Sequence, residues 1–391
     1  MAEAPARGFP AQEFEQRTRR AQDRMADAGI DALLLTTEVE LRYFSGYLTQ
    51  FWQSPTRPWF LVVPASGKPI AVIPTIGAAC MGRTWIEDIR TWSSPQPHDE
   101  GISLLVETLQ EVLGTGGVLG ISEGPETHLR MPVSDYRRMM TLLPGIATRD
   151  CSAILRDLRM VKSDAEITKI IHICDLVSDV FEDLPNFIHT GMSEIEVFRT
   201  FKIKCLEQGV DDVSYLVGGA GQGGYGDIIS PPRERRITQG DVLILDTGCL
   251  FDGYFCDFDR NYAFGHASDD AKRAYETVYA ATEAGFAAAK VGATCADLFH
   301  AMQDVMTKAG ALGNDVGRLG HGLGMQLTEW PSNTPQDQTV LKPNMVMTLE
   351  PGMTFAPGLV MVHEENIVIR DSGPEYLTPA AIQQDDHRPR Q

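Results

Sequence analysis

An Asp-Gly pair between two apolar stretches is the feature that most restricts how this chain can fold. Asp252-Gly253 stands between two segments with the apolar character of strands, a pattern that strongly predicts a β-hairpin. With a two-residue turn, Asp246 lies opposite Asp259, and Asp257 lies diagonal to Asp246 on the same face. A longer loop would instead set Asp246 opposite Asp257 on that shared face. Three carboxylates so placed repel one another unless a cation offsets their charge or some of them face solvent.

A second pair of strands carries two more carboxylates. An apolar strand over 345–349 runs directly into Glu350, and another over 359–369 is interrupted at His363-Glu364-Glu365. Alternation places Glu364 on the apolar face of its strand, where a charged side chain is rarely left unpaired. His321 stands between two glycines, which allow its backbone to approach another group closely. Taken alone, such a histidine is more often a loop or core residue than a ligand.

These residues together indicate a metal site. Two Asp, one His and two Glu supply five ligands, four of which are hard oxygens. Such a set suits two divalent transition ions (Mn, Fe, Co or Zn) bridged by carboxylates and by a water or hydroxide. The five candidates are Asp246, Asp257, His321, Glu350 and Glu364.

The pattern of expected helices and strands divides the chain into two parts near residue 155. The first part predicts an α/β unit, and the second predicts α+β packing of helices against a mostly antiparallel sheet. Expected helices are 14–28, 102–113, 270–290 and 296–308, with capping boxes opening two more at Ser163 and Ser193. Expected strands are 32–35, 59–64, 69–74, 118–121, 213–217, 242–246, 254–264, 345–349 and 359–369.

Five ordered segments resemble the metal-binding pattern of the pita-bread metallopeptidase family, which includes methionine aminopeptidase, prolidase, aminopeptidase P and creatinase. The segments are LDTG, GYFCDFDR, GHGLG, TLEPG and EENIVI. The resemblance implies that the five candidates are the metal ligands. It also implies a pseudo-symmetric α+β catalytic domain over 156–391, a creatinase/prolidase-type domain over 1–155, and usually a homodimer.

The chain departs from the peptidases of this family at several positions. Thr328 replaces a histidine that they usually carry seven residues after the ligand histidine, and the stretch 226–236 lacks their substrate-side histidine. Val362 stands where prolidases often place an arginine, and Asp259 replaces a threonine. The metal site therefore looks intact, whereas the residues that handle protons and anchor substrate have changed.

We therefore expect a metal-dependent hydrolase that cleaves a small amide or Xaa-Pro-like dipeptide with a metal-bridged hydroxide. Glu350 or Glu364 moves the proton, and Thr328 is expected to contact the substrate. The alternative is a lyase acting on a small zwitterion, similar to the dimethylsulfoniopropionate lyases of the family, with Asp259 as base. A plainer role for Asp259 is an ion pair with Arg260 or Arg236. A second alternative is a non-catalytic binding protein on the same fold.

A dinucleotide site is the main rival motif. Residues 219–224 match G-x-G-x-x-G after a strand-like stretch, but Pro231-Pro232 follow where a helix would have to begin. This glycine-rich loop, together with Tyr225, is instead expected to line the substrate pocket.

The net charge and the cysteine content indicate which binding partners and which cellular compartment to expect. Lys and Arg total 34 against 53 Asp and Glu, a formal net charge of −19, which argues against binding nucleic acid or anionic lipid. No apolar run reaches the length of a membrane span, and residues 1–10 lack the pattern of a secretory signal. Seven cysteines without a C-x-x-C pair favour a reducing compartment, and we expect the cytoplasm.

Overall fold

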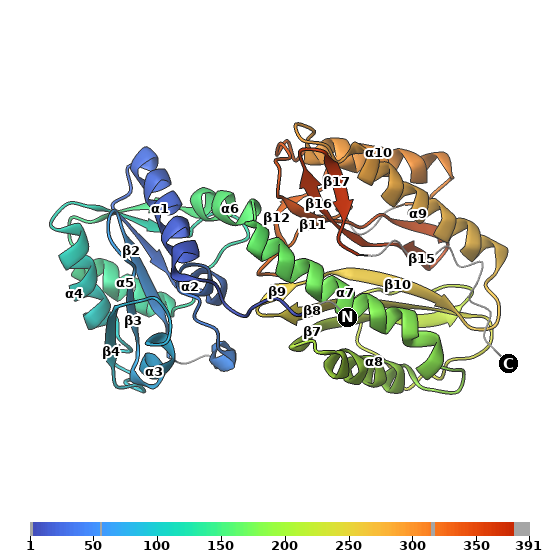
Figure 1. The fold of residues 1–391 in the computed structure, drawn as a ribbon, viewed down its shortest axis with the longest axis horizontal. Helices are drawn as coiled ribbons and strands as arrows, with labels where there is room; N and C mark the ends of the chain where they lie inside the picture. Colours follow the sequence, from blue (N-terminus) through green and yellow to red (C-terminus); the bar gives the residue numbers. More distant parts are fainter. Residues whose placement is uncertain (1–2, 55–56, 314–316, 379–391) are drawn as a thin grey trace. The chain divides into compact units, whose positions relative to one another are not determined.

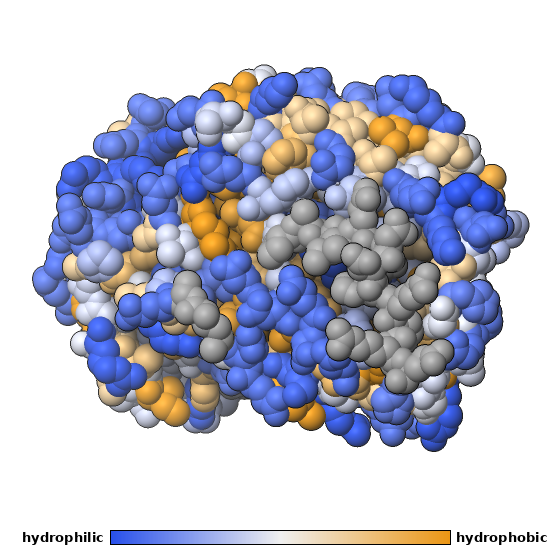
Figure 2. All heavy atoms as spheres, turned by 45° about the vertical axis from the view of Figure 1, so that its right-hand side comes forward, coloured by the Kyte–Doolittle hydropathy of each residue, from blue (hydrophilic) through white to orange (hydrophobic). Residues whose placement is uncertain are grey.

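The computed structural model describes residues 3–54, 57–313 and 317–378 (Figure 1). These residues form two compact units, Ala6–Arg159 and a second that begins at Met160 and includes residues 3–5. No helix in the described ranges is both long and apolar enough to cross a membrane. The face drawn in Figure 2 is mostly hydrophilic, with apolar residues in separate small groups.

The first unit is a six-stranded mixed sheet with the strand order β4-β3-β2-β1-β5-β6. Its strands are β1 (Ala32–Leu35), β2 (Phe60–Pro64), β3 (Ile70–Pro74), β4 (Asp88–Trp92), β5 (Val118–Ile121) and β6 (Ala147–Asp150). Its helices are α1 (Ala11–Ala28), α2 (Glu38–Ser45), α3 (Ala78–Met81), α4 (Ile102–Leu113), α5 (Val133–Leu142) and α6 (Ser152–Met160), with 3-10 turns η1 (Gln50–Gln53) and η2 (Thr75–Gly77). The predicted hairpin of β2 and β3 is confirmed, and α4 contributes apolar residues to a core built on this sheet.

The second unit opens with two helices whose capping boxes were predicted. Ser163 and Ser193 each accept a hydrogen bond from the backbone of the glutamate three residues on, whose carboxylate reaches back. The helices are α7 (Asp164–Phe187) and α8 (Glu194–Gln208), followed by strands β7 (Asp212–Gln222), β8 (Asp241–Phe251), β9 (Tyr254–Phe255) and β10 (Phe258–Ala263). Helix α7 packs on β8 and α8 packs on β7.

The rest of this unit repeats the order of two helices followed by antiparallel strands. Its helices are α9 (Asp269–Ala288) and α10 (Cys295–Lys308). Its strands are β11 (His321–Gly322), β12 (Glu329–Ser332), β13 (Val346–Leu349), β14 (Gly352–Ala356), β15 (Leu359–Val362), β16 (Glu365–Arg370) and β17 (Gly373–Tyr376). Helix α9 packs on β13, β14 and β15, and β10 contacts β16 (Figure 1). The α+β architecture predicted for this unit is confirmed, because every strand pair in it is antiparallel.

The structure differs from expectation in the glycine-rich segment after residue 217. Residues 219–222, expected in a loop, continue β7 and pair with β8. The glycines allow close backbone packing: a Cβ atom on Gly218 would lie 2.2 Å from the carbonyl oxygen of Ile244. Glycine is usually depleted in strands, and it occurs there where another backbone approaches closely.

Two long predicted strands are also interrupted. The 254–264 strand breaks at Cys256-Asp257, and the 359–369 strand breaks at His363-Glu364. The second break lets the chain leave the two-stranded sheet of β14 and β15 and enter the five-stranded sheet beside β13. One residue of each break is a predicted metal ligand, so both side chains project from irregular backbone between strands.

Candidate metal centre

The hairpin of β8 with β9 and β10 has the predicted register. Asp252 and Gly253 form its turn with φ of 47° and 78°, as a type I′ turn requires. Asp246 pairs directly with Asp259, and Cys256 N donates to Cys249 O, which continues the same register up to Asp257. Local chain chemistry therefore sets Asp246 opposite Asp259, and Asp257 follows directly before β10.

Asp257 meets two predicted ligands from the second half of the unit. One ligand atom each from Asp257, His321 and Glu364 lies within 4.8 Å of the other two, and all three side chains are buried. His321 Nε2 is 3.4 Å from Asp257 Oδ2. This spacing is short enough for one divalent ion to contact all three groups.

The imidazole of His321 is oriented for coordination. Its Nδ1 lies 2.9 Å from the Gly322 carbonyl oxygen, which can only accept, so Nδ1 carries the proton and Nε2 presents a lone pair. Burial and then the charge of Arg318 lower the pKa of His321 to about 4, which keeps the ring neutral near pH 7. A neutral imidazole with a fixed tautomer is the form that binds a metal.

The glycines around His321 are required by close packing. Gly320 has φ of +123°, and a Cβ atom there would lie 2.2 Å from the carbonyl oxygen of Thr348. A Cβ atom on Gly322 would lie 2.4 Å from the carbonyl oxygen of Trp330. Backbone contact on both sides therefore fixes the strand that carries the histidine between β12 and β13.

Asp246 and Glu350 lie close enough to act electrostatically on this trio. Burial, followed by the charge of Glu350, raises the pKa of Asp246 to about 8, and burial raises the pKa of Glu350 to about 7. Burial and then neighbouring carboxylates also raise the pKa values of Asp257 and Glu364 well above the usual range. The four carboxylates therefore destabilise one another unless protons or cations neutralise them.

Two carboxylate oxygens in this group lack a hydrogen-bond partner among the described residues. Asp246 Oδ1 and Glu364 Oε1 are both sealed from solvent and accept no hydrogen bond. Buried polar atoms are almost always hydrogen-bonded, so each exception calls for an explanation. A divalent cation would satisfy both oxygens and would offset the mutual repulsion of the carboxylates. The residues present therefore fit the metal that the sequence predicts.

Asn366 holds Asp257 in place, a role that the sequence analysis missed. Its Oδ1 accepts from Asp257 N at 3.0 Å, and its Nδ2 donates to Asp257 O. The amide thus replaces a strand partner for the irregular backbone at Asp257 and ties it to β16. Its place two residues after Glu364 was the available signal, but asparagines on strands have many roles.

Asp259 is fully buried next to Arg260 and Asn261, which form their own polar contacts. The Arg260 guanidinium binds Glu365 at 3.1 Å and donates to the backbone carbonyls of Asp259 and Glu364. Asn261 Nδ2 lies 3.4 Å from Asp259 Oδ1. Burial and then the charge of Asp246 raise the pKa of Asp259 well above its usual range. Asp259 is 1% exposed, which leaves a substrate little access to its carboxylate.

The two predicted substrate contacts are placed differently. Tyr225 is buried, and its hydroxyl donates to Asn261 Oδ1 at 2.8 Å and accepts from Val362 N at 3.0 Å. Its hydroxyl is thus already engaged within the fold. Thr328 is half-buried, and its Oγ1 accepts from Arg318 Nη2 at 3.1 Å.

Two half-buried residues at the centre were not found from the sequence. Burial and then the charges of four of the predicted ligands, Asp246 first, raise the pKa of Tyr215. The charge of Arg318 acts on His321 and Glu350. Arg318 lies three residues before His321, and this spacing was its only signal in the sequence. Tyr215 lies on β7, and nothing in the sequence pattern marked it.

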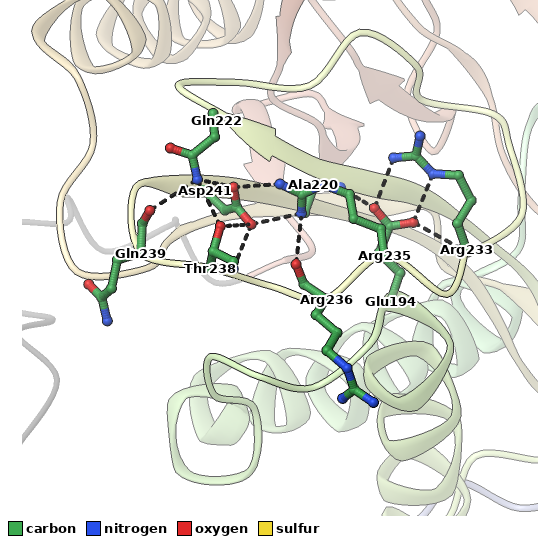
Figure 3. Close-up of polar contacts among 9 residues, drawn as sticks. All are labelled: Glu194, Ala220, Gln222, Arg233, Arg235, Arg236, Thr238, Gln239 and Asp241. Atoms are coloured by element: carbon green, nitrogen blue, oxygen red, sulfur yellow. Dashed lines mark hydrogen bonds and ion pairs between the residues drawn. The ribbon is translucent and has the colours of Figure 1, made fainter.

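The stretch 226–236, which lacks the expected histidine, is anchored by two ion pairs (Figure 3). Arg233 binds Glu194 through two nitrogens at 3.1 and 3.0 Å, and Arg235 binds Asp241 through two at 2.7 Å. Both carboxylates are fully buried and accept further hydrogen bonds from Ala220 N or Thr238 N. Bidentate pairs of this kind fix a loop firmly, because they combine charge with geometry.

Comparison with known proteins agrees with this geometry. Residues 168–371 match metallopeptidase family M24, and residues 17–161 match the creatinase/prolidase N-terminal domain. The probable dipeptidase PepE of Mycobacterium tuberculosis (strain ATCC 25618 / H37Rv) is 29% identical over 367 residues, 93% of this chain and 94% of that protein.

Two solved structures share the whole fold. The prolidase from Thermococcus sibiricus superposes with a TM-score of 0.84 at 24% identity, covering 94% of this chain and 97% of that chain. Dipeptidase PepE from Mycobacterium ulcerans superposes with a TM-score of 0.83 at 25% identity, covering 96% and 98%. The predicted two-part architecture is therefore confirmed over nearly the whole chain.

Proposed function

Because the chain belongs to metallopeptidase family M24, we propose that it is a two-metal dipeptidase whose substrates include Xaa-Pro dipeptides. Membership of the family makes it a metallohydrolase and implies divalent metal cofactors. The number of ions, their identity and the substrate are the parts that we propose. One observation supports them: carboxylates and a neutral histidine converge, and two of the carboxylate oxygens have no hydrogen-bond partner within the described ranges.

We assign five residues to the two ions. The trio of Asp257, His321 and Glu364 would hold one ion, and Asp246 and Glu350 would complete the pair of sites with carboxylates shared between them. The full proposed set is Asp246, Asp257, His321, Glu350 and Glu364. Oxygen-rich ligands with a single imidazole favour Mn²⁺ among the divalent transition ions. Two such ions would activate a water molecule as nucleophile and polarise the scissile carbonyl.

Glu350 is the better placed of the two glutamates to move the proton. Glu364 is 2% exposed, whereas Glu350 is half-buried and follows directly after β13. A carboxylate that remains accessible from solvent can accept a proton from water and return it to a leaving amine. We therefore assign the proton transfer to Glu350.

The names of the relatives support the choice of substrate. The mycobacterial relatives are described as dipeptidases, and a similar structure from Bacillus anthracis is an Xaa-Pro dipeptidase. All seven cysteines are free, in accord with the reducing, cytoplasmic setting that we propose. A homodimer completes the proposal.

A substrate panel tests the function. The metal-loaded protein should release free amino acids from dipeptides, with Xaa-Pro and non-proline dipeptides compared at equal concentration, and chelation should abolish the activity. Release of an unsaturated product from a small zwitterion, with no dipeptide cleaved, would favour the lyase alternative. Absence of any turnover together with absence of bound metal would favour a binding protein.

A further inference from the structure

The chain segments that carry Asp257 and Glu364 meet without pairing through their backbones. β10 begins directly after Asp257 and belongs to one sheet, whereas the chain around Glu364 passes from β15, in a second sheet, to β16, in a third. β10 contacts β16, but within the described ranges its backbone pairs with β8 and with neither β15 nor β16. The distance between these two proposed ligands therefore depends on side-chain contacts rather than on a backbone ladder.

Side chains from both segments span this gap. Asn261 Nδ2 donates to Val362 O at 2.7 Å, just before the break in the second segment. Arg260 Nη1 donates to Glu364 O at 3.2 Å, within the break. The Asn366 amide, after the break, binds the backbone that leads into β10. These hydrogen bonds join the two segments at three successive points around one proposed ligand.

Arg260 holds the backbone of the proposed ligand Glu364 directly. Its Nη1 also donates to Asp259 O at 2.7 Å, so a single nitrogen joins carbonyl oxygens of both segments. Its Nη2 binds Glu365 Oε2 at 3.1 Å, and its Cζ lies 4.8 Å from the centre of the Phe258 ring. The side chains of Arg260 and Glu365 are 12% and 2% exposed. A planar fork held by three oxygen acceptors and a ring has little freedom to move.

The contribution of Arg260 to the centre is chiefly geometric. Glu365 supplies a counter-charge, so the pair as a whole is neutral and does little to offset the other carboxylates. The pair instead fixes the carbonyl of Glu364, and with it the point from which that side chain leaves the backbone. Coordination bonds to divalent ions tolerate deviations of only about 0.2 Å, so a small shift of this point weakens them.

We propose that Arg260 is a positioning residue, which sets the place of Glu364 relative to the ligands on the first segment and thereby determines how tightly divalent ions bind. This inference rests on the proposed function, because it takes Glu364 as a metal ligand. Arg260 itself binds neither ion nor substrate, and it acts through the Glu364 backbone. A lysine cannot take its place, because one ammonium group on a flexible stem does not hold three fixed acceptors.

Calorimetric titration of metal-free protein with Mn²⁺ tests the proposal. Arg260→Lys, which keeps the charge without the fork, should weaken Mn²⁺ binding by about 10- to 100-fold. Arg260→Met alone would leave the buried carboxylate of Glu365 unpaired and endanger folding, so the second variant is Arg260→Met combined with Glu365→Gln. This double variant should show a loss of the same size. Glu365→Gln alone retains both carbonyl contacts of Arg260 and should weaken binding far less.

A buried arginine in the first unit gives a matched control. Arg17 is fully buried, its Nε binds Glu13 Oε1 at 3.1 Å, and its Nη1 donates to Tyr43 O at 3.0 Å, which is the same combination of a carboxylate and a backbone carbonyl. Arg17→Met combined with Glu13→Gln should lower the Tm without changing Mn²⁺ affinity. All titrations are made at a temperature at which circular dichroism shows every variant folded, so that a loss of stability is not measured as a loss of affinity.

Wild-type Mn²⁺ affinity in either Arg260 variant would overturn the proposal, and so would equal weakening in Glu365→Gln or in the Arg17 control. Dipeptide hydrolysis separates the inference from the proposed function. If the Arg260 variants bind Mn²⁺ weakly although the wild-type protein cleaves no dipeptide, the inference stands and the proposed function fails. If the wild-type protein cleaves dipeptides and the Arg260 variants bind Mn²⁺ equally tightly, the function stands and the inference fails. A wild-type protein that binds no Mn²⁺ overturns both.

Discussion

A buried ion pair supports the segment that carries Thr328, and removing its cation gives a prediction of defined size. Lys162 Nζ lies 3.1 Å from Glu329 Oε2, and the two side chains are 2% and 4% exposed. Glu329 Oε1 also accepts from the backbone N–H groups of Met325 and Gln326 at 2.9 and 3.2 Å, so this carboxylate closes the turn between β11 and β12.

Lys162→Met removes the ammonium and leaves a buried carboxylate without that cation. Breaking a buried pair from one side costs about 3 to 5 kcal/mol, and because Glu329 keeps two N–H hydrogen bonds the expected loss is about 3 kcal/mol. For a unit of this size, that loss corresponds to a fall in Tm of about 6 to 12 °C. The double variant Lys162→Met with Glu329→Gln keeps an acceptor for the turn without a buried charge, and should lose less than Lys162→Met alone.

The assay is urea unfolding of the metal-loaded variants followed by circular dichroism. Lys204→Met is a matched control, because Lys204 and Glu207 are also 3.1 Å apart but 39% and 61% exposed, and it should cost less than about 1 kcal/mol. The reasoning is refuted if Lys162→Met costs no more than this control, or if the double variant is less stable than Lys162→Met.

Three further predictions concern the centre itself. Asn366→Leu removes both hydrogen bonds to the Asp257 backbone and should weaken Mn²⁺ binding by at least about 10-fold in calorimetry; unchanged affinity would contradict the role of this amide. Gly320→Ala should destabilise the protein by more than about 2 kcal/mol in urea titrations, because the new Cβ would meet a carbonyl oxygen. Gly292 also has a positive φ but open space around it, so Gly292→Ala should cost about 1 kcal/mol. Equal effects of the two substitutions would contradict the close-contact argument. In metal-free protein, burial raises the pKa of Asp246 to about 8 and that of Glu350 to about 7, above their values of about 4 in the unfolded chain. The folded state therefore binds more protons than the unfolded state, and the free energy of unfolding should fall as the pH rises from 5 to 8. Saturating Mn²⁺ should remove this fall, and metal-free protein that is more stable at pH 8 than at pH 5 would contradict the clustering of the carboxylates.

The hairpin could be predicted because its determinants are local. An Asp-Gly turn sets the register, and the period of two in a strand then fixes that Asp246 and Asp259 share a face. Helix starts at Ser163 and Ser193 were predictable for the same reason, since a capping box lies within four residues.

The contacts that complete the centre are not local. Asp257 reaches His321 and Glu364 because β10 lies beside β16 and Asn366 bridges them, and no periodicity in one strand encodes that approach. The residue types and their order along the chain indicated the ligand set beforehand, and the family resemblance implied the same five residues. The hydrogen bond from Arg318 to Thr328 could not be predicted either, because the two residues lie ten positions apart in the sequence and meet only in the folded chain.

The number of metal ions bound to the chain tests the central claim most directly. Calorimetric titration of metal-free protein with Mn²⁺ should show two ions per chain, with proton release on binding, and Asp257→Asn should abolish or severely weaken that binding. Binding of no ion, or an Asp257→Asn variant that still binds two ions with wild-type affinity, would contradict the proposed two-metal centre.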